Sequence, residues 1–166
     1  AVSAAKYASA KGIPVFIDAS PASKSHSLEV LPEVEIFSPN EIETYEYTGI
    51  LPAGADSSLR AALALRKMVK CKYLVIKQGA RGAFVYDGKH YRMIPAYRAD
   101  KVVDTTAAGD VFTAALTLSY IQGADILSAT EFGAAAGAIT VSRLGASVSA
   151  PTFDEVCDFI KTHPQR

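Results

Sequence analysis

Two aspartates lie close together in the stretch VDTTAAGDVFTAAL, which covers residues 103–116. Asp104 and Asp110 flank the small-residue turn TTAAG, and an apolar run typical of a helix follows. Small residues let a ligand approach the backbone, and the first N–H groups of a helix have no partner inside the helix. The sequence therefore predicts an anion site at the amides of residues 107–109, favoured by the helix dipole.

The carboxylate of Asp110 belongs to the first turn of the same helix, within reach of whatever the amides hold. Phosphoryl transfer to a hydroxyl uses such a pair of features. The N–H groups stabilise charge on the moving phosphoryl group, and the carboxylate accepts the hydroxyl proton. The residues alone leave a second interpretation equally open, in which Asp110 is only a helix-start residue favoured by the dipole.

The elements that must position this stretch alternate between helices and strands. The patterns predict helices over residues 3–10, 40–49, 56–70, 108–122, 128–142 and 152–163. They predict strands over 13–18, 35–39, 73–77 and 101–104, and a hairpin over 82–94 that turns at Asp87-Gly88. Expected caps are Asp56 or Ser57, the pair Ser128 and Glu131, and the pair Thr152 and Glu155. This alternation favours an α/β architecture with a largely parallel sheet.

Composition narrows the class of protein. The chain has 166 residues, which suits a single domain, and 17 basic residues balance 17 acidic ones. Zero net charge gives no reason to expect nucleic acid or an anionic membrane as a partner. No apolar run spans a bilayer, and the first residues do not resemble a signal peptide. Cys71 and Cys157 have no metal-ligand spacing, so we expect reduced thiols and a cytoplasmic protein.

The segment DTTAAGDVFTAAL closely resembles the C-terminal signature of the ribokinase-like (PfkB) family of carbohydrate kinases, Asp-Thr-x-Gly/Ala-Ala-Gly-Asp. The resemblance implies that Asp110 is the catalytic base for a sugar hydroxyl. It also implies that Ala107, Ala108 and Gly109 form the anion hole, with Asp104 and Asp110 as the substrate-binding pair. Ala107 stands where many members have Gly, which costs little if its φ is negative.

Two further motifs in the same order resemble the family and imply ATP and Mg²⁺ as cofactors. SPNEIE carries the Asn-x-x-Glu motif as Asn40 and Glu43, which in the family helps to place Mg²⁺ and the phosphates. Asn40 taken alone is more simply an N-cap. VIKQGARGAF resembles the nucleotide loop Thr-Leu-Gly-x-x-Gly, although two glycines between strands are usually only a hairpin turn. Its candidates for nucleotide binding are Lys77, Gly79, Arg81 and Gly82, with Lys77 replacing the commoner Thr as a cation that could meet a phosphate.

The segment FGAAAGAITVSRLGASVSAP forms the last motif. Its helix has a small face, Gly133, Ala134, Gly137 and Ala138, which suits either close helix packing or a flat ring. The resemblance places the adenine near Ala134. It also implies a monovalent cation, usually K⁺, held mostly by backbone carbonyls. By position the cation ligands are Asp104, Thr106, Thr140, Arg143, Gly145 and Ser149, and the Arg143 side chain is expected to face solvent.

The resemblance covers the chain from VFIDASPA, which is similar to the Asn/Asp-Pro-x-Pro region, to the last helix. It corresponds to the C-terminal half of family members. We therefore expect a three-layer ribokinase-like α/β fold with a mostly parallel central sheet, C-terminal portion only, with the lid absent. Residues 1–166 would form a single domain, the nucleotide-binding and catalytic half of a kinase.

The expected function is ATP-dependent phosphorylation of a sugar, with the small-molecule sugar and ATP as partners. Ribokinase is the nearest subtype, and fructokinase, 2-keto-3-deoxygluconate kinase and nucleoside kinase stay open. A non-catalytic nucleotide-binding module is the alternative from another class. We expect the 166-residue chain alone to be inactive, since its acceptor site would be missing. The resemblance also allows a homodimer of the full-length protein.

Overall fold

The structure is a computed structural model and describes residues 1–20, 22, 27–163 and 165. Pro21, in the family-like stretch after the first strand, lies outside the described residues. The helices are α1 (Val2–Ala10), α2 (Glu41–Thr48), α3 (Ala55–Leu65), α4 (Ala108–Ile121), α5 (Ile126–Thr140) and α6 (Phe153–Thr162), with short 3-10 turns η1 (Leu28–Val30), η2 (Gly79–Arg81) and η3 (Ser147–Ser149). The strands are β1 (Phe16–Asp18), β2 (Val34–Ser38), β3 (Cys71–Lys77), β4 (Ala83–Tyr86) and β5 (Tyr91–Ile94).

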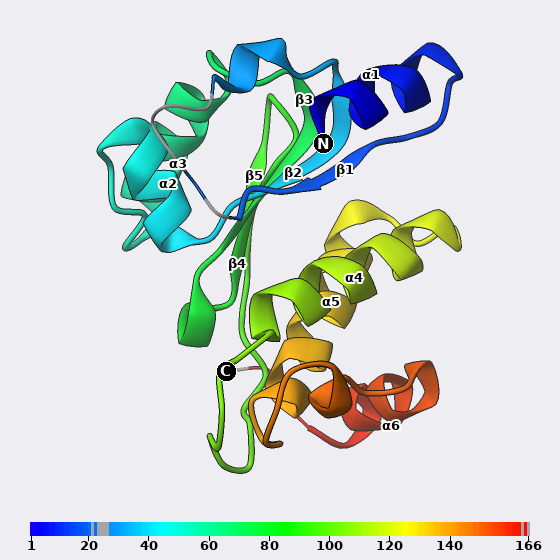
Figure 1. Cartoon of the computed structure of the whole chain (residues 1–166). Helices are drawn as coiled ribbons and strands as arrows, with labels where there is room; N and C mark the ends of the chain where they lie inside the picture. Colours follow the sequence, from blue (N-terminus) through cyan, green and yellow to red (C-terminus); the bar gives the residue numbers. More distant parts are fainter. Residues whose placement is uncertain (21, 23–26, 164, 166) are drawn as a thin grey trace. The chain divides into compact units, whose positions relative to one another are not determined.

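The five strands form one sheet in the order β1-β2-β3-β4-β5 (Figure 1). β1, β2 and β3 are parallel, and Ile36 lies opposite both Phe16 and Tyr73. β4 follows β3 after a connection too short for a parallel crossover, which needs a dozen or more residues. The same holds for β5 after β4, so β4 alone runs against the other strands. The predicted α/β fold with a mostly parallel sheet is confirmed.

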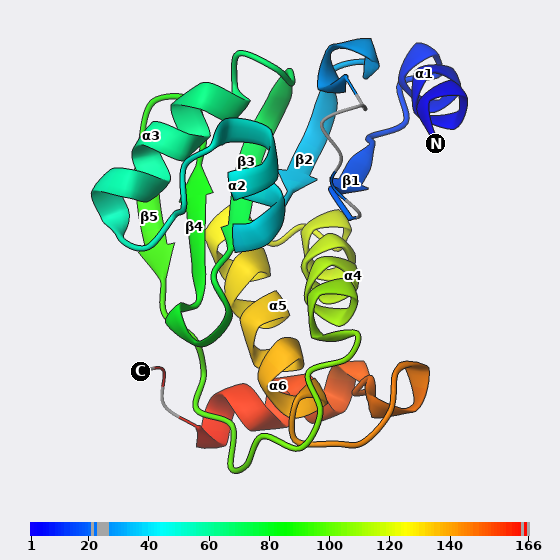
Figure 2. The same cartoon turned by 60° about the vertical axis from the view of Figure 1, so that its left-hand side comes forward.

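The chain contacts group into two compact units, residues 1–78 with 84–92 and residues 79–83 with 93–166. In the first unit, α2 and α3 pack on each other and both contact β3 (Figure 2). Nearly continuous apolar runs make β2 and β3 suitable for burial on both faces. The core of this unit contains Val34, Ile36, Phe37, Ala61, Ala62, Leu65, Leu74, Val75, Ile76 and Phe84.

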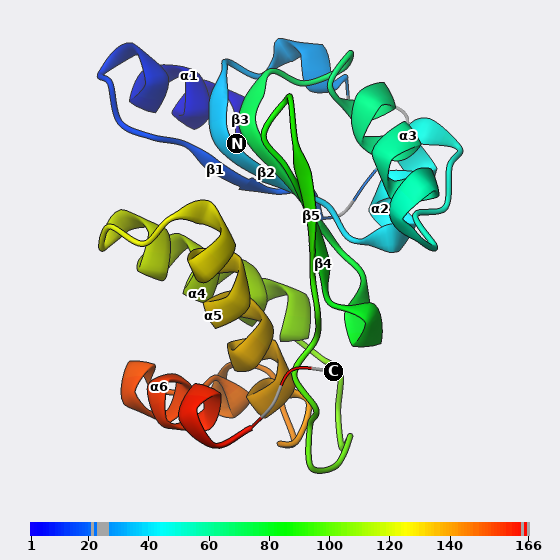
Figure 3. The ribbon, with the colours of Figure 1, turned by 180° about the vertical axis from the view of Figure 1, so that it is seen from behind.

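In the second unit, α4 and α5 lie side by side and α6 packs on α5 (Figure 3). The small residues of α5 explain how closely α4 approaches. A Cβ added at Gly133 would lie 2.8 Å from the Phe112 carbonyl oxygen and 3.2 Å from Leu116 Cβ. Helix packing therefore accounts for Gly133. Within the described residues, no helix has the length and apolar character that crossing a membrane requires.

The predicted strand at 101–104 is wrong. Those residues form no strand, because the backbone here is bonded to a helix end. The N–H groups of Val103 and Asp104 donate to the Val141 carbonyl oxygen, at 2.7 and 3.3 Å. This contact ties the chain just before α4 to the end of α5.

Two predicted helix starts are also wrong. α5 begins at Asp125, whose Oδ1 accepts hydrogen bonds from the amides of Leu127 and Ser128, so the carboxylate replaces Ser128 as the cap. α3 begins after Gly54, and Ser57 closes the turn from inside by accepting the Gly54 N–H at 3.0 Å. The capping box at the start of α6 and the β4–β5 hairpin are confirmed.

Candidate active site

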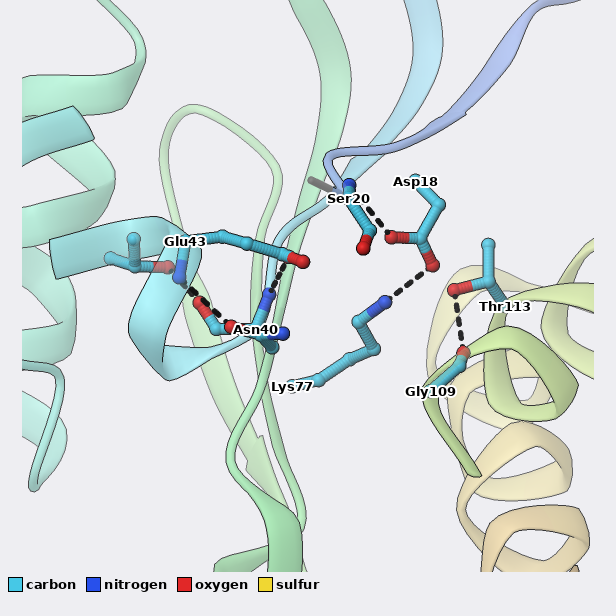
Figure 4. Close-up of polar contacts among 8 residues, drawn as sticks. Asp18, Ser20, Asn40, Glu43, Lys77, Gly109 and Thr113 are labelled. Carbon is cyan, nitrogen blue, oxygen red and sulfur yellow. Dashed lines mark hydrogen bonds and ion pairs between the residues drawn. The ribbon is translucent and has the colours of Figure 1, made fainter. Parts of the chain in front are cut away.

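Within the first unit, the carboxyl ends of the three parallel strands bring polar residues together. Asp18 is the last residue of β1, Asn40 comes just after β2, and Lys77 is the last residue of β3. Asn40 and Lys77 form a parallel bridge, and the Lys77 N–H donates to the Pro39 carbonyl oxygen at 2.8 Å. Figure 4 shows their side chains at this edge. Open α/β sheets bind their ligands at the carboxyl ends of strands.

Asn40 and Glu43 close the start of α2 with a reciprocal capping box. Asn40 Oδ1 accepts the Glu43 N–H at 2.9 Å, and Glu43 Oε2 accepts the Asn40 N–H at 2.6 Å (Figure 4). The N-cap interpretation of Asn40 is therefore correct. Asn40 Nδ2 and Glu43 Oε1 take no part in the box and bond to none of the other described residues. One donor and one acceptor thus remain for a ligand.

Lys77 forms an ion pair that the sequence analysis did not anticipate. Its Nζ lies 2.5 Å from Asp18 Oδ2, and the lysine side chain is only 9% exposed. None of the sequence motifs assigned a role to Asp18. The available signal was its place at the end of a parallel strand, inside the stretch that resembles the Asn/Asp-Pro-x-Pro region.

The glycines of the predicted nucleotide loop belong to the second unit. Gly79 and Gly82 both have positive φ, 53° and 93°, and the Gly82 N–H donates to the Gly79 carbonyl oxygen. A Cβ at Gly82 would lie 1.9 Å from the Ile94 carbonyl oxygen, so no other residue fits. Backbone geometry accounts for both glycines without a ligand. The nucleotide role of this loop, including the exposed Arg81, stays a prediction.

The start of α4 is the turn that carries the predicted anion site. Ala107 is the N-cap residue with φ 61°, and no side chain caps the helix. The condition for a low cost, a negative φ, is thus not met, because the turn requires a left-handed residue here. That conformation costs an L-residue roughly 1–2 kcal/mol. Strain of this kind collects at ligand-binding turns, where the surrounding structure imposes it.

Two of the three predicted amides at this turn are open. The Ala108 N–H donates to the Thr105 carbonyl oxygen at 3.3 Å, so it is already engaged in a long hydrogen bond. The amides of Ala107 and Gly109 have no hydrogen-bond partner within the part of the chain that the structure describes. The predicted anion hole would therefore depend mainly on Ala107 and Gly109.

Asp110 lies in the first turn of α4 and is exposed. Among the residues described, its carboxylate has neither an ion pair nor a hydrogen bond. Neighbouring Thr113 instead bonds back to the Gly109 carbonyl oxygen at 3.1 Å (Figure 4). The carboxylate is thus available to accept a proton from a ligand beside the open amides.

Asp104 joins this turn to the segment after α5. Its Oδ1 accepts the Thr106 N–H at 2.9 Å and its Oδ2 accepts the Gly145 N–H at 3.1 Å. The Thr106 hydroxyl, followed by the amides of Thr106 and Gly145, lowers the pKa of the Asp104 carboxyl. Three of the predicted cation-site residues are therefore held together by one carboxylate.

The other predicted cation ligands lie along the same segment. The Thr140 carbonyl oxygen accepts the Arg143 N–H at 3.1 Å, and buried Ser149 donates its hydroxyl to the Ala146 carbonyl oxygen. The Arg143 side chain does not simply face solvent. Its Nη2 pairs with Glu155 Oε1 at 2.5 Å. Across the described residues, no group of three or more acidic, Cys or His side chains could hold a metal ion.

Ala134, the predicted neighbour of the adenine, is buried in α5. The adjacent Gly133 and Gly137 face α4, and a Cβ at Gly137 would lie 3.7 Å from the Ala108 carbonyl oxygen. Packing explains Gly133 but not Gly137, where an added Cβ would make only ordinary van der Waals contact. The role of Ala134 toward a nucleotide stays a prediction.

Comparison with known proteins shows the family and supports the class of fold. Residues 2–153 match the pfkB family of carbohydrate kinases, and the chain belongs to this family. It is 33% identical over 158 residues to the ribokinase of Haemophilus influenzae, covering 95% of this chain and 51% of that protein. The ribokinase of Arabidopsis thaliana is 30% identical over 161 residues, covering 96% of this chain and 42% of that protein.

A solved structure of Arabidopsis thaliana ribokinase complexed with ribose and ATP superimposes with a TM-score of 0.85 at 29% identity. The superposition covers 96% of this chain and 51% of the ribokinase chain. The ribokinase-like fold predicted from the motifs is confirmed. The chain spans about half the length of these relatives.

Proposed function

We propose that this chain is the nucleotide-binding and catalytic part of an ATP-dependent sugar kinase of the ribokinase type. The observation that carries the proposal is the start of α4. Within the described residues, the amides of Ala107, Gly109 and Asp110 have no partner there, and an exposed, unpaired carboxylate lies in the first turn of the same helix. Relatives named ribokinase, one of them solved with ribose and ATP, support the choice of acceptor and donor.

The chain's own groups have distinct roles in this proposal. Asp110 accepts the proton of the sugar hydroxyl as the hydroxyl oxygen attacks the terminal phosphorus of ATP. The bond between that phosphorus and the bridging oxygen breaks, and ADP leaves. The N–H groups of Ala107 and Gly109 stabilise the negative charge on the transferring phosphoryl oxygens. The Asp104 hydrogen bonds to Thr106 and Gly145 hold the turn, so that these groups need little rearrangement.

The residues also fit the proposed cofactors. Glu43 Oε1 and Asn40 Nδ2 face no competing partner among the described residues, which suits Mg²⁺, directly or through water, and a phosphate oxygen. Lys77 and Arg81 supply positive charge for phosphates. Bound Mg²⁺ would neutralise phosphate charge. A K⁺ ion would take Asp104, Thr106, Thr140, Arg143, Gly145 and Ser149, mostly through carbonyl oxygens.

The test is ADP release by the complete reading frame that contains this chain. The assay contains Mg-ATP and K⁺ and compares ribose, fructose, 2-keto-3-deoxygluconate and nucleosides as acceptors. The critical variant is Asp110→Asn, and Asp154→Asn is its matched control, because Asp154 is an acidic residue in the first turn of α6. We expect turnover with one acceptor, a loss of about 10²–10⁴-fold in Asp110→Asn, and unchanged turnover in the control.

Other outcomes have clear meanings. Equal losses in both variants would reduce Asp110 to a helix-start residue. ATP binding without turnover on any acceptor would favour the non-catalytic nucleotide-binding module. The 166-residue chain, assayed beside the complete reading frame, is expected to bind nucleotide without sustained turnover.

A further inference from the structure

The ion pair between Asp18 and Lys77 joins two strands that are not neighbours. β2 lies between β1 and β3 in the sheet, so their ends are separated by two strand spacings, roughly 9.5 Å. The Lys77 side chain therefore extends across the carboxyl end of β2 to reach Asp18. In Figure 4 it runs past Asn40 toward the Asp18 carboxylate.

Both oxygens of the Asp18 carboxylate are engaged. Oδ2 accepts from Lys77 Nζ, and Oδ1 accepts the Ser20 N–H at 3.3 Å. The backbone contact fixes the orientation of the carboxylate, and the carboxylate in turn fixes the ammonium. A Lys side chain has a long flexible stem and about 2 kcal/mol of rotamer entropy. Holding the ammonium in place before a ligand binds therefore lowers the entropy cost of binding.

Burial makes the pairing more than a surface contact. The lysine side chain is 9% exposed and the aspartate side chain 23%. A charge in such a place is costly unless it is paired. The Lys77 ammonium and the open amide donor of Asn40 both come from residues at the carboxyl ends of the parallel strands.

We propose that Asp18 is a positioning residue for nucleotide binding: it holds the Lys77 ammonium across the end of β2, where the ammonium meets a phosphate oxygen of ATP. This inference rests on the proposed function, because it takes a nucleoside polyphosphate as the ligand. Asp18 itself does not contact the phosphate, since two anionic groups side by side would repel each other. A preplaced cation raises affinity by reducing the ordering cost of binding.

The test compares four versions of the complete reading frame by titration calorimetry with ATP and with adenosine. They are the unchanged protein, Asp18→Asn, Lys77→Thr, and the double variant with both substitutions. We expect ATP affinity to fall about tenfold or more in Asp18→Asn, with adenosine affinity unchanged. The double variant should bind ATP no more weakly than Lys77→Thr alone, because Asp18 acts through Lys77.

A merely structural role would predict a different result, an equal loss for ATP and adenosine. If Asp18→Asn weakened ATP binding by the same factor in the Lys77→Thr background as in the unchanged protein, Asp18 would act independently and the inference would be overturned. Unchanged ATP affinity in Asp18→Asn would also overturn it while leaving the kinase proposal intact. An unchanged protein that binds no ATP would instead refute the proposed function, and this inference with it.

One complication is loss of folding in Asp18→Asn, because Lys77 would be buried without this partner. Thermal unfolding without nucleotide detects it. If Asp18→Asn does not fold, the Asp18→Glu variant is used in its place, because it keeps the negative charge but moves it by one methylene. The expected result is a loss of ATP affinity with adenosine binding retained, and unchanged ATP affinity would contradict the positioning role.

Discussion

The starts of α2 and α4 solve the same physical problem in opposite ways. Each helix begins with amides that have no partner inside the helix. At α2, the side chains of Asn40 and Glu43 each accept one backbone N–H in a reciprocal box, and the N-cap backbone is extended. At α4, no side chain caps the helix, the N-cap residue is left-handed, and the amides of Ala107, Gly109 and Asp110 stay open within the described chain.

The difference separates a helix start that its own side chains stabilise from one that has backbone donors to offer a ligand. A capped start gains about 0.5–2 kcal/mol from its own side chains and has few donors to offer. An uncapped start gives up that stabilisation and adds strain at Ala107. In the proposed function, its amides gain a partner when the phosphoryl group binds. The following predictions test this contrast, beginning with the largest expected effect.

Gly133→Ala tests whether α5 fixes the position of α4. The added Cβ would lie 2.8 Å from the Phe112 carbonyl oxygen, so the helices must separate. We expect a loss of about 2–3 kcal/mol in the free energy of unfolding, measured by urea denaturation. Gly137→Ala is the matched control, because its Cβ would lie 3.7 Å from the nearest carbonyl oxygen. It should be neutral or stabilising by up to about 1 kcal/mol. Equal effects of both variants would contradict this packing.

Asn40→Ala tests the capped start. Removing the Oδ1 acceptor leaves the Glu43 N–H without its bond, and we expect a loss of about 1–2 kcal/mol in the same unfolding experiment. Asn40→Asp keeps an acceptor at this position and should retain most of the stability. If Asn40→Ala were as stable as the unchanged protein, the cap would contribute nothing, and the contrast between the two helices would disappear.

The sequence predicted the elements and the motifs better than the details of individual turns. The alternation of apolar runs and breakers identified the α/β class, and the capping box of α6 was visible as Thr152 with Glu155. Local patterns could not show that Val103 and Asp104 bond to Val141, because that contact joins residues far apart in the sequence. The ion pair between Asp18 and Lys77 was hidden for the same reason. The pair depends on strand order, which no single motif carries.

Ala107→Gly tests the strain at the uncapped start. Glycine adopts φ 61° without a Cβ penalty, so we expect the variant to be more stable by about 1 kcal/mol after the added chain entropy of glycine is subtracted. Ala108→Gly is the control, because Ala108 is already helical and should lose up to about 1 kcal/mol. Urea denaturation of both variants measures the difference. A destabilised Ala107→Gly would show that the turn is not strained.

The start of α5 sharpens the comparison, because its cap can be switched off by acid. The Ser128 hydroxyl, with the amides of Ser128 and Leu127, lowers the pKa of Asp125 from its ordinary value of 3.8. A lowered pKa means that this stabilisation is complete well above pH 3.8 and is lost as the pH falls toward the folded-state value. Asp125→Asn keeps a capping oxygen but does not titrate.

We therefore expect the free energy of unfolding of the unchanged protein to exceed that of Asp125→Asn by a few tenths of a kcal/mol from about pH 8 to pH 5. The gap should close below about pH 4, as measured by urea midpoints across the pH range. A gap that stayed constant down to about pH 3 would mean that the carboxylate charge contributes nothing to the cap. In that case the capped start of α5 depends only on its hydrogen-bond acceptor and not on charge. The uncapped start of α4 would then differ from it only in backbone conformation and in the absence of an acceptor.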